Sequence, residues 1–327
     1  PIVGPILACL WFGWVPALLW IVLGAIFIGG VHDLGSLMAS LRHDGASIGE
    51  VVKEHLPRVY KLFLVFVWLA LIYVIIAFTD ITAQTFKTVT LDQSFGPAVA
   101  GSSLLYIVAA VVMGVLLYRF KMKLGMATAI FLPVVLLIIW AGPHLPPAFL
   151  GFLSGISIKQ WDAVLLAYCF VASLIPMWIL LQPRGYLGGW LLYLVIAIGL
   201  IGALFGGFRI EYPAFNLAGL QGADNHKLIF PLLFITVACG ACSGFHGIVS
   251  SGTTSKQIEK HRDALPVGYG AMLLEGLVAV LAMATVMMLP KGTAALKAEP
   301  NLIYAQGIAQ YMGLLKINFN FALPFAL

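Results

Sequence analysis

The sequence predicts an all-α polytopic membrane protein, and three observations lead to that fold class. Hydrophobic residues make up 61% of the 327-residue chain, charged residues make up 9%, and the mean hydropathy is +1.02. These values lie far outside the range of soluble globular proteins. The apolar residues also gather in long runs that short polar loops separate. Each long run has the roughly 20 residues that an α-helix needs to cross a bilayer.

Eight apolar runs are long enough to form complete spans. Residues 1–12 contain Gly4–Pro5 in a stretch too short to cross, as in the second half of an interrupted helix, and the region 301–327 is incomplete. We expect one transmembrane domain over 1–327, as an internal fragment of a longer protein. The predicted spans are 14–41, 62–86, 99–118, 124–140, 162–181, 189–206, 228–251 and 267–289.

The positive charges of the loops alternate along the chain. One set of loops carries eleven Lys and Arg residues and the other set carries six. Loops rich in Lys and Arg stay in the cytoplasm. The sequence therefore predicts that the richer set is cytoplasmic, namely 42–61, 119–123, 182–188 and 252–266, and that the alternate loops 87–98, 141–161, 207–227 and 290–300 lie outside.

The loop 42–61 has the signature of a short surface helix. Ser47 and Glu50 match a capping box, and Ile48, Val51 and Val52 share one face of the helix that would follow. We interpret this helix as interfacial structure.

Two helix interruptions suggest an internal repeat. One lies at Gly4–Pro5 and the other at Ser173–Pro176, five predicted helices later and in a span of opposite direction. Broken helices in corresponding positions of two halves are typical of transporters built from an inverted repeat. The pattern therefore indicates a five-helix inverted repeat, although proline kinks are also common in membrane helices.

Two acidic residues fall deep within predicted spans. Asp33, next to His32, lies nine residues before Arg42, which is about 13 Å along a helix. Glu275 lies nine residues after Pro266. Ionisable residues at this depth usually line a pathway or relay protons. The alternative is structural: Asp33 as a tether to a neighbouring helix, and Glu275 as a helix-packing contact.

The span 228–251 is the most polar one. At helical spacing Cys239, Ser243, His246 and Ser250 form one stripe, which must face other helices or a water-filled cavity. Hydroxyls and unwound carbonyls hold coupling cations or substrate in inverted-repeat transporters. His246 could equally be a neutral histidine in a helix interface, and the hydroxyls at 252–255 could be helix caps.

Several other classes are disfavoured. Cys239, Cys242 and His246 have the spacing of metal ligands, but no fourth ligand is evident, so we expect no metal and no cofactor. The net charge of +5 is explained by the loops, so no nucleic-acid partner is expected. Neither a phosphate-binding glycine loop nor a nucleophile elbow is present, and we expect the chain not to be an enzyme.

Motifs spread over most of the chain resemble those of the carbon starvation protein A family of bacterial membrane transporters. The resemblance implies proton-coupled import of peptides or pyruvate and a LeuT/APC-like fold with a five-helix inverted repeat. It does not choose between the two substrates. The matching stretches are Gly4–Leu7, Ala25–Asp33, Arg42–Gly45 with Ser47 and Glu50, Phe170–Pro176 with Pro183–Arg184, Cys239–His246 through Ser250–Thr254, and Gly268–Met272.

We therefore predict a secondary transporter of the bacterial inner membrane that imports a small carboxylate-bearing nutrient, either a peptide or pyruvate. The coupling ion is the proton, with sodium as the alternative, and the oligomeric state is not predicted. A membrane nutrient sensor with a transporter-like fold is the alternative function. The predicted substrate-binding residues are Gly4, Pro5, Ser173, Pro176, Ser243, Gly244, His246 and Ser250. The predicted coupling residues are Asp33, Glu275, His32, Ser251 and Thr254.

Overall fold

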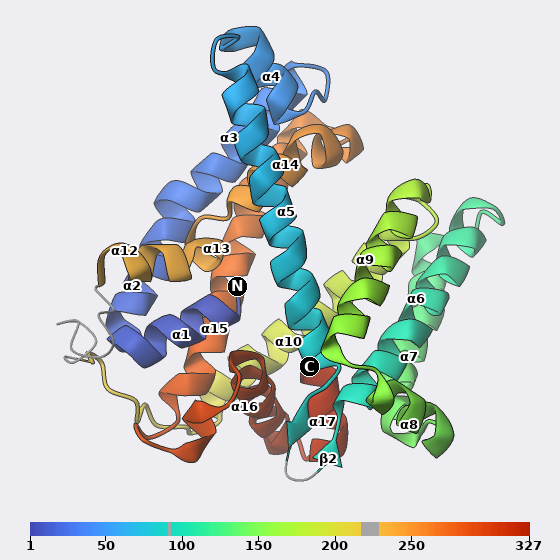
Figure 1. Cartoon of the computed structure of the whole chain (residues 1–327), viewed down its shortest axis with the longest axis vertical. Helices are drawn as coiled ribbons and strands as arrows, with labels where there is room; N and C mark the ends of the chain where they lie inside the picture. Colours follow the sequence, from blue (N-terminus) through green and yellow to red (C-terminus); the bar gives the residue numbers. More distant parts are fainter. Residues whose placement is uncertain (91–92, 217–228) are drawn as a thin grey trace. The chain divides into compact units, whose positions relative to one another are not determined.

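The computed structural model describes residues 1–90, 93–216 and 229–327, which fold into two compact units (Figure 1). Unit 1 comprises Pro1–Leu71 and Gly207–Gly307, and unit 2 comprises Ile72–Gly206 and Ile308–Leu327. Two helices, α5 and α16, contribute residues to both units.

Unit 1 is built from short and long helices that are interrupted by π-helical turns. Its elements are α1 (Val3–Phe12), α2 (Trp14–Gly24), η1 (Ala25–Gly29), α3 (Gly30–Arg42), α4 (Ile48–His55), the start of α5 (Tyr60–Thr85), α12 (Ile229–Thr236), α13 (Ala238–Ala241), α14 (Gly244–Val249), η3 (Ser250–Thr254), η4 (Ser255–Gln257), η5 (His261–Asp263), η6 (Leu265–Gly270), α15 (Ala271–Met287), η7 (Ala294–Lys297) and the start of α16 (Pro300–Leu314).

Unit 2 is also helical, apart from one antiparallel pair of two-residue strands. Its elements are the rest of α5, β1 (Val89–Thr90), β2 (Gln93–Ser94), α6 (Gly96–Tyr118), α7 (Leu124–Ala141), η2 (Gly142–His144), α8 (Pro147–Gly155), α9 (Ile158–Leu174), α10 (Leu181–Phe205), the end of α16, and α17 (Phe319–Ala326).

Six helical segments within the described residues are long and apolar enough to cross a membrane. They correspond to six of the eight predicted spans, which confirms an all-helical integral membrane protein of several spans. The six are Trp14–Arg42, Tyr60–Thr85, Gly96–Tyr118, Leu124–His144, Leu181–Phe205 and His261–Met287.

The predicted span 162–181 is wrong in its boundaries. Helix α9 begins after a capping box formed by Ser157 and Gln160, and it ends at Leu174. Ile175 is extended because the following Pro176 disfavours a helical conformation there. Helices α8 and α9 meet at a bend of 97°, and only if this pair is counted as one span do the described residues contain seven.

The predicted loop 182–188 is also wrong, because α10 begins at Leu181 and runs through it. Pro183 lies in the first turn of this helix. Backbone N–H groups in a first turn have no intrahelical acceptor, so the missing N–H of proline costs no hydrogen bond there. Pro183 therefore belongs to the start of a helix rather than to a loop.

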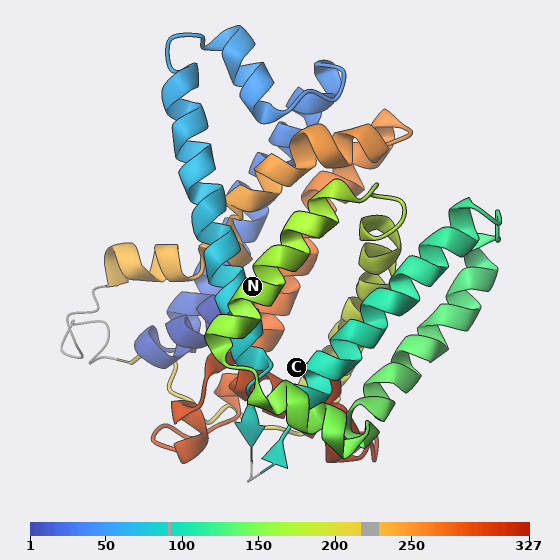
Figure 2. The same cartoon turned by 45° about the vertical axis from the view of Figure 1, so that its right-hand side comes forward.

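The predicted span 228–251 is not one helix but a series of short pieces, α12, α13 and α14, which change direction along the chain (Figures 1 and 2). Cys242 and Ser243 adopt extended conformations between α13 and α14. Glycines and short polar residues have low helix propensity, so tertiary contacts decide the conformation here. Leu228 and residues 217–227 of the predicted loop 207–227 lie outside the described residues.

Small residues bring these pieces close to their neighbours in unit 1. Gly24 and Gly29 both lie against Ala241 of α13, and Gly276 of α15 lies against Ala25. Gly247 of α14 packs against the His32 ring on α3. Close approach through small residues is the usual basis of helix packing in membranes. It places the polar residues of α13 and α14 between α3 and α15.

Candidate functional site

An imidazole lies between two carboxyl groups in unit 1. The His246 Nδ1 atom, on α14, lies 2.7 Å from Asp33 Oδ2 on α3, within hydrogen-bond distance. Its Nε2 atom lies 2.6 Å from Glu275 Oε2 on α15. The second contact has the distance of an ion pair but not the alignment of a hydrogen bond. We call Asp33, His246 and Glu275 the buried cluster.

The second oxygen of each carboxyl group also has a partner. The Cys239 Sγ atom donates to Glu275 Oε1 at 3.0 Å, and His32 Nδ1 lies 3.0 Å from Asp33 Oδ1. Four helical elements, α3, α13, α14 and α15, therefore contribute to one network of hydrogen bonds and ion pairs. Networks of this kind are stable only when their members are satisfied, since an unpaired polar group in a low-dielectric interior is costly.

The members of the buried cluster differ in their exposure. Asp33 is 3% exposed, the Glu275 side chain is 12% exposed, and the His246 side chain is 31% exposed. Removing one partner from a buried ionic contact leaves an uncompensated charge, which is strongly unfavourable. His246 is the basic side chain that both carboxyl groups share, Asp33 has His32 as a second one, and the His246 ring itself reaches a more open space.

The geometry allows the cluster to gain or lose one proton. A neutral imidazole offers one N–H donor and one lone pair, whereas an imidazolium offers two donors. With both carboxyl groups ionised, only the imidazolium presents a donor to each of them, and the cluster has a net charge of −1. One more proton on a carboxyl group makes the cluster neutral. The cluster can therefore exchange a proton with a modest rearrangement of hydrogen bonds.

Two of the helices that carry the cluster, α3 and α15, have a π-helical turn beside them, and α14 is followed by η3, where the backbone is kinked at Ser251 and Gly252. Turn η1 ends four residues before Asp33, η3 begins four residues after His246, and η6 ends five residues before Glu275. Such turns widen a helix locally and occur frequently at functional sites.

The cluster faces a cavity of about 180 Å³. Asp33 and His246 contribute its charged wall, Ser250 and Thr254 contribute hydroxyl groups, and the rest of its lining is apolar. A cavity with an apolar wall and a few converging polar groups is the usual form of a small-ligand site. Its other lining residues are Leu37, Val249, Val267, Gly268 and Ala271.

The predicted hydroxyl residues occupy different positions around α14. Ser250 donates to the Gly247 carbonyl at 3.3 Å and Thr254 donates to the Val249 carbonyl at 3.2 Å. The Ser251 hydroxyl donates to the Gly247 carbonyl and accepts from the Ile48 N–H at the start of α4. Ser251 therefore joins η3 to the surface helix.

Two further predicted residues, Ser243 and Gly244, lie where the chain enters α14. Ser243 is buried at the N-cap position, although its side chain makes no capping hydrogen bond. A Cβ atom added at Gly244 would meet no heavy atom within 4 Å. Both lie within the three residues that precede His246.

The two predicted helix interruptions fall in different units. In unit 1, Gly4 and Pro5 form the first turn of α1, where Gly4 lies against the backbone of Thr236. In unit 2, Ser173 donates to the Phe170 carbonyl at 2.6 Å, just before the break at Pro176. The structure thus places Gly4 and Pro5 next to α12, and Ser173 and Pro176 at the end of α9.

Sequence reasoning missed the part that Cys239 has in the network. The sequence placed this thiol in the polar stripe of the span 228–251 but gave it no partner, and the structure shows that it donates to Glu275. The spacing of seven residues between Cys239 and His246 was a usable signal, because it places both on one side of the chain over about two helical turns. The contact with Glu275 could not be read from spacing, since the two residues lie 36 positions apart.

The fold and the buried cluster define a polytopic helical membrane protein with an ionisable centre between its helices. Comparison with protein families identifies that protein further. The sequence profile of the family described as carbon starvation protein CstA matches residues 1–320. The chain belongs to this family, which confirms the resemblance seen in its motifs.

Curated relatives agree with this assignment. The chain is 33% identical over 315 residues to the peptide transporter CstA of Bacillus subtilis, covering 94% of this chain and 50% of the relative. It is 33% identical over 297 residues to the peptide transporter CstA of Helicobacter pylori, covering 89% of this chain and 42% of the relative. It is 32% identical over 308 residues to the pyruvate/proton symporter BtsT of Escherichia coli, covering 89% of this chain and 40% of the relative.

These relatives are named as transporters, and the chain spans about half or less of their length. No solved structure matches the chain significantly.

Proposed function

We propose that the chain is part of a proton-coupled secondary transporter that imports peptides or pyruvate. The observation that carries the proposal is the His246 ring held between Asp33 and Glu275 at a helix break. Ionisable groups inside a membrane protein that face one another and a cavity are typical of proton relays. The names of the relatives support the same conclusion, since one of them is a pyruvate/proton symporter.

The buried cluster supports a proton rather than a sodium ion as the coupling ion. A sodium site needs several oxygen ligands around an empty centre, whereas here a ring nitrogen lies directly against each carboxyl group. In our proposal, Asp33, His246 and Glu275 hold the proton, and His32 orients Asp33. Ser251 and Thr254 keep the adjacent turn in place.

The cavity beside the cluster supports a substrate position in unit 1. We place the polar end of the substrate near His246, Ser243, Gly244 and Ser250, with Gly4 and Pro5 at the neighbouring helix start. A substrate carboxylate would be repelled while both carboxyl groups of the cluster are ionised, because the cluster then has a net charge of −1. This repulsion is lost when one carboxyl group takes up a proton and the cluster becomes neutral. Binding and protonation then favour each other, which is the thermodynamic requirement for symport.

We further propose that both units belong to one transporter domain with a LeuT/APC-like inverted repeat. The end of α9 at Leu174 and the broken segment α12–α14 support this, because discontinuous helices surround the substrate in such folds. In this proposal, Ser173 and Pro176 bind substrate at the second helix break, which lies in unit 2.

The proposed location is the bacterial inner membrane, with the loops 42–61, 119–123 and 252–266 on the cytoplasmic side. The excess of Lys and Arg in these loops supports the orientation. The stretch 182–188 would lie at the same side as the first turns of α10.

The test is uptake of radiolabelled pyruvate and short peptides into proteoliposomes that contain the full-length protein. Accumulation of one substrate class should require an inwardly directed proton gradient, and replacing sodium by potassium should leave it unchanged. Binding without uptake would instead identify a nutrient sensor. Uptake that follows the sodium gradient and ignores the proton gradient would contradict the proposed coupling.

A further inference from the structure

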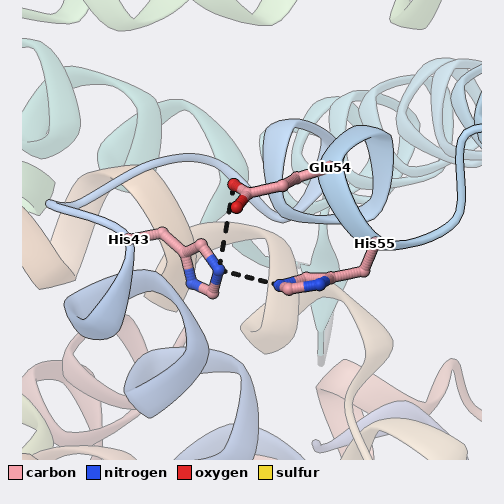
Figure 3. Close-up of side chains that lie close together, drawn as sticks. All are labelled: His43, Glu54 and His55. Carbon is pink, nitrogen blue, oxygen red and sulfur yellow. Dashed lines mark hydrogen bonds and ion pairs between the residues drawn. The ribbon is translucent and has the colours of Figure 1, made fainter.

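A second group of histidine and acidic side chains lies at the surface of unit 1, where α3 ends and α4 packs beside it (Figure 3). His43 is the C-cap residue of α3, and Glu54 and His55 are the last two residues of α4. We call His43, Glu54 and His55 the surface cluster. None of its members takes part in the transport mechanism proposed above.

The ligand atoms of the surface cluster converge on one point. His43 Nε2 lies 2.9 Å from His55 Nε2 and 4.0 Å from Glu54 Oε2 (Figure 3). One ligand atom from each residue lies within 4.8 Å of the others. Tetrahedral zinc with bonds of about 2.0–2.1 Å holds its ligand atoms about 3.3 Å apart. Shifts of about 0.4 Å between the two rings and about 0.7 Å between His43 and Glu54 would give that spacing, and the Glu54 and His55 side chains are exposed.

The hydrogen bond on the other side of the His43 ring prepares it as a ligand. His43 Nδ1 lies 2.7 Å from the Ala39 carbonyl oxygen, which can only accept, so Nδ1 carries a hydrogen. In the neutral ring, Nε2 then has a lone pair that points at His55. A hydrogen bond from the second ring nitrogen to a carbonyl is the usual way in which proteins orient a metal-binding histidine.

The backbone around the surface cluster is held by hydrogen bonds. The turn after His43 is closed by the Gly45 N–H donating to the Ser40 carbonyl, and the Ser40 hydroxyl donates to the Ala46 carbonyl. A capping box between Ser47 and Glu50 fixes the start of α4. The turn after His43 and the helix that carries Glu54 and His55 are therefore fixed in position without a metal ion.

We propose that His43, Glu54 and His55 bind one divalent transition-metal ion of the zinc type, with water completing its coordination. Two imidazoles and one carboxylate are a ligand set that zinc uses when it keeps one position open. Imidazole nitrogen also binds Zn²⁺, Co²⁺ or Ni²⁺ in preference to Mg²⁺ and Ca²⁺, which require oxygen ligands. The bound ion would connect the end of α3 to the end of α4.

The test is a zinc titration of the full-length protein, purified in detergent without a histidine tag. A chromophoric chelator that competes for zinc should report one ion per chain. His55→Ala should lower the affinity at least about tenfold, and Glu54→Gln should lower it less, because one ligand of three is lost or weakened. Cobalt should show the visible absorption of a site with nitrogen ligands.

His144→Ala is the matched control, because His144 is an exposed surface histidine of unit 2. It should bind zinc as the unsubstituted protein does. The proposal is overturned if no saturable binding is found, if His43→Ala and His55→Ala bind zinc with unchanged affinity, or if magnesium competes equally well.

Discussion

The buried cluster and the surface cluster both combine histidine with carboxyl groups, and both include a residue of α3 or its cap. Asp33 lies in the first turn of α3 and His43 caps its last turn, about 15 Å further along the axis. In the buried cluster the ring contacts a carboxyl group through each nitrogen. In the surface cluster one ring nitrogen contacts another ring, and the carboxylate is more distant.

The difference follows from the surroundings of the two clusters. Where water is excluded, each charge needs an opposite charge or a hydrogen bond, so the ring is saturated by acidic partners. At the surface water solvates the carboxylate, and ring lone pairs can remain available for an external ligand. The same residue types therefore suit proton exchange at one end of α3 and metal binding at the other.

The largest expected effect is on coupled transport. Glu275→Gln should abolish accumulation of substrate against a gradient while exchange of substrate across the membrane continues, because the amide cannot take up the proton that the carboxylate shares with His246. Uptake and counterflow into proteoliposomes measure the two activities. Glu259→Gln, an exposed acid between η4 and η5, is the control and should retain both. Unchanged accumulation by Glu275→Gln would remove this residue from the mechanism.

The next largest effect concerns the free energy of unfolding, which should differ between variants of the two clusters. His246→Ala leaves two buried carboxyl groups without their shared partner and should lower the free energy of unfolding by about 3 kcal/mol. His55→Ala, in metal-free buffer, should change it by no more than about 0.5 kcal/mol, as expected for an exposed position. Denaturation in detergent compares the variants. Equal losses of unfolding free energy in His246→Ala and His55→Ala would contradict the difference that we describe between the clusters.

A smaller loss is expected where α14 touches α3. Gly247→Ala adds a Cβ atom 2.6 Å from the His32 ring and 3.1 Å from the Ser36 hydroxyl, so these groups must move. Overpacking of this kind should cost about 2 kcal/mol. Gly244→Ala on the same helix is the matched control, since its Cβ atom meets nothing within 4 Å. Similar thermal stability of the two variants would show that the close approach is not needed.

The smallest effect concerns the start of α4, which positions the surface cluster. Ser47→Ala removes the side-chain cap and should raise the hydrogen-exchange rates of the α4 amides about fivefold. Hydrogen bonds from the Ser47 N–H and hydroxyl lower the pKa of the Glu50 carboxyl. This contribution to stability is present above the unfolded pKa and is lost as the pH falls through the lower folded value. Unchanged exchange rates would show that other contacts hold α4.

The sequence predicted most of the long helices, because a run of 20 apolar residues has few alternatives in a bilayer. It also predicted the capping box at Ser47 and the break before Pro176, since both depend on adjacent residues. It did not predict the break at Cys242–Ser243. There the local preferences are weak, and contacts with Gly24, Gly29 and α15 determine where the helix ends.

The candidate site was predicted residue by residue but not as an assembly. Asp33, His246 and Glu275 each stood out as an ionisable group deep in an apolar segment. Their mutual contacts join positions 213 and 29 residues apart, which spacing along one helix cannot reveal. The same limit explains why the contact between Cys239 and Glu275 was not predicted.

Proton uptake on substrate binding tests the central claim most directly. In weakly buffered detergent solution, a pH indicator should report about one proton taken up per chain when the full-length protein binds its substrate, whether pyruvate or a short peptide. Glu275→Gln should bind substrate with no such uptake, and Glu259→Gln should behave as the unsubstituted protein does. Proton uptake of the same size by Glu275→Gln would contradict the account.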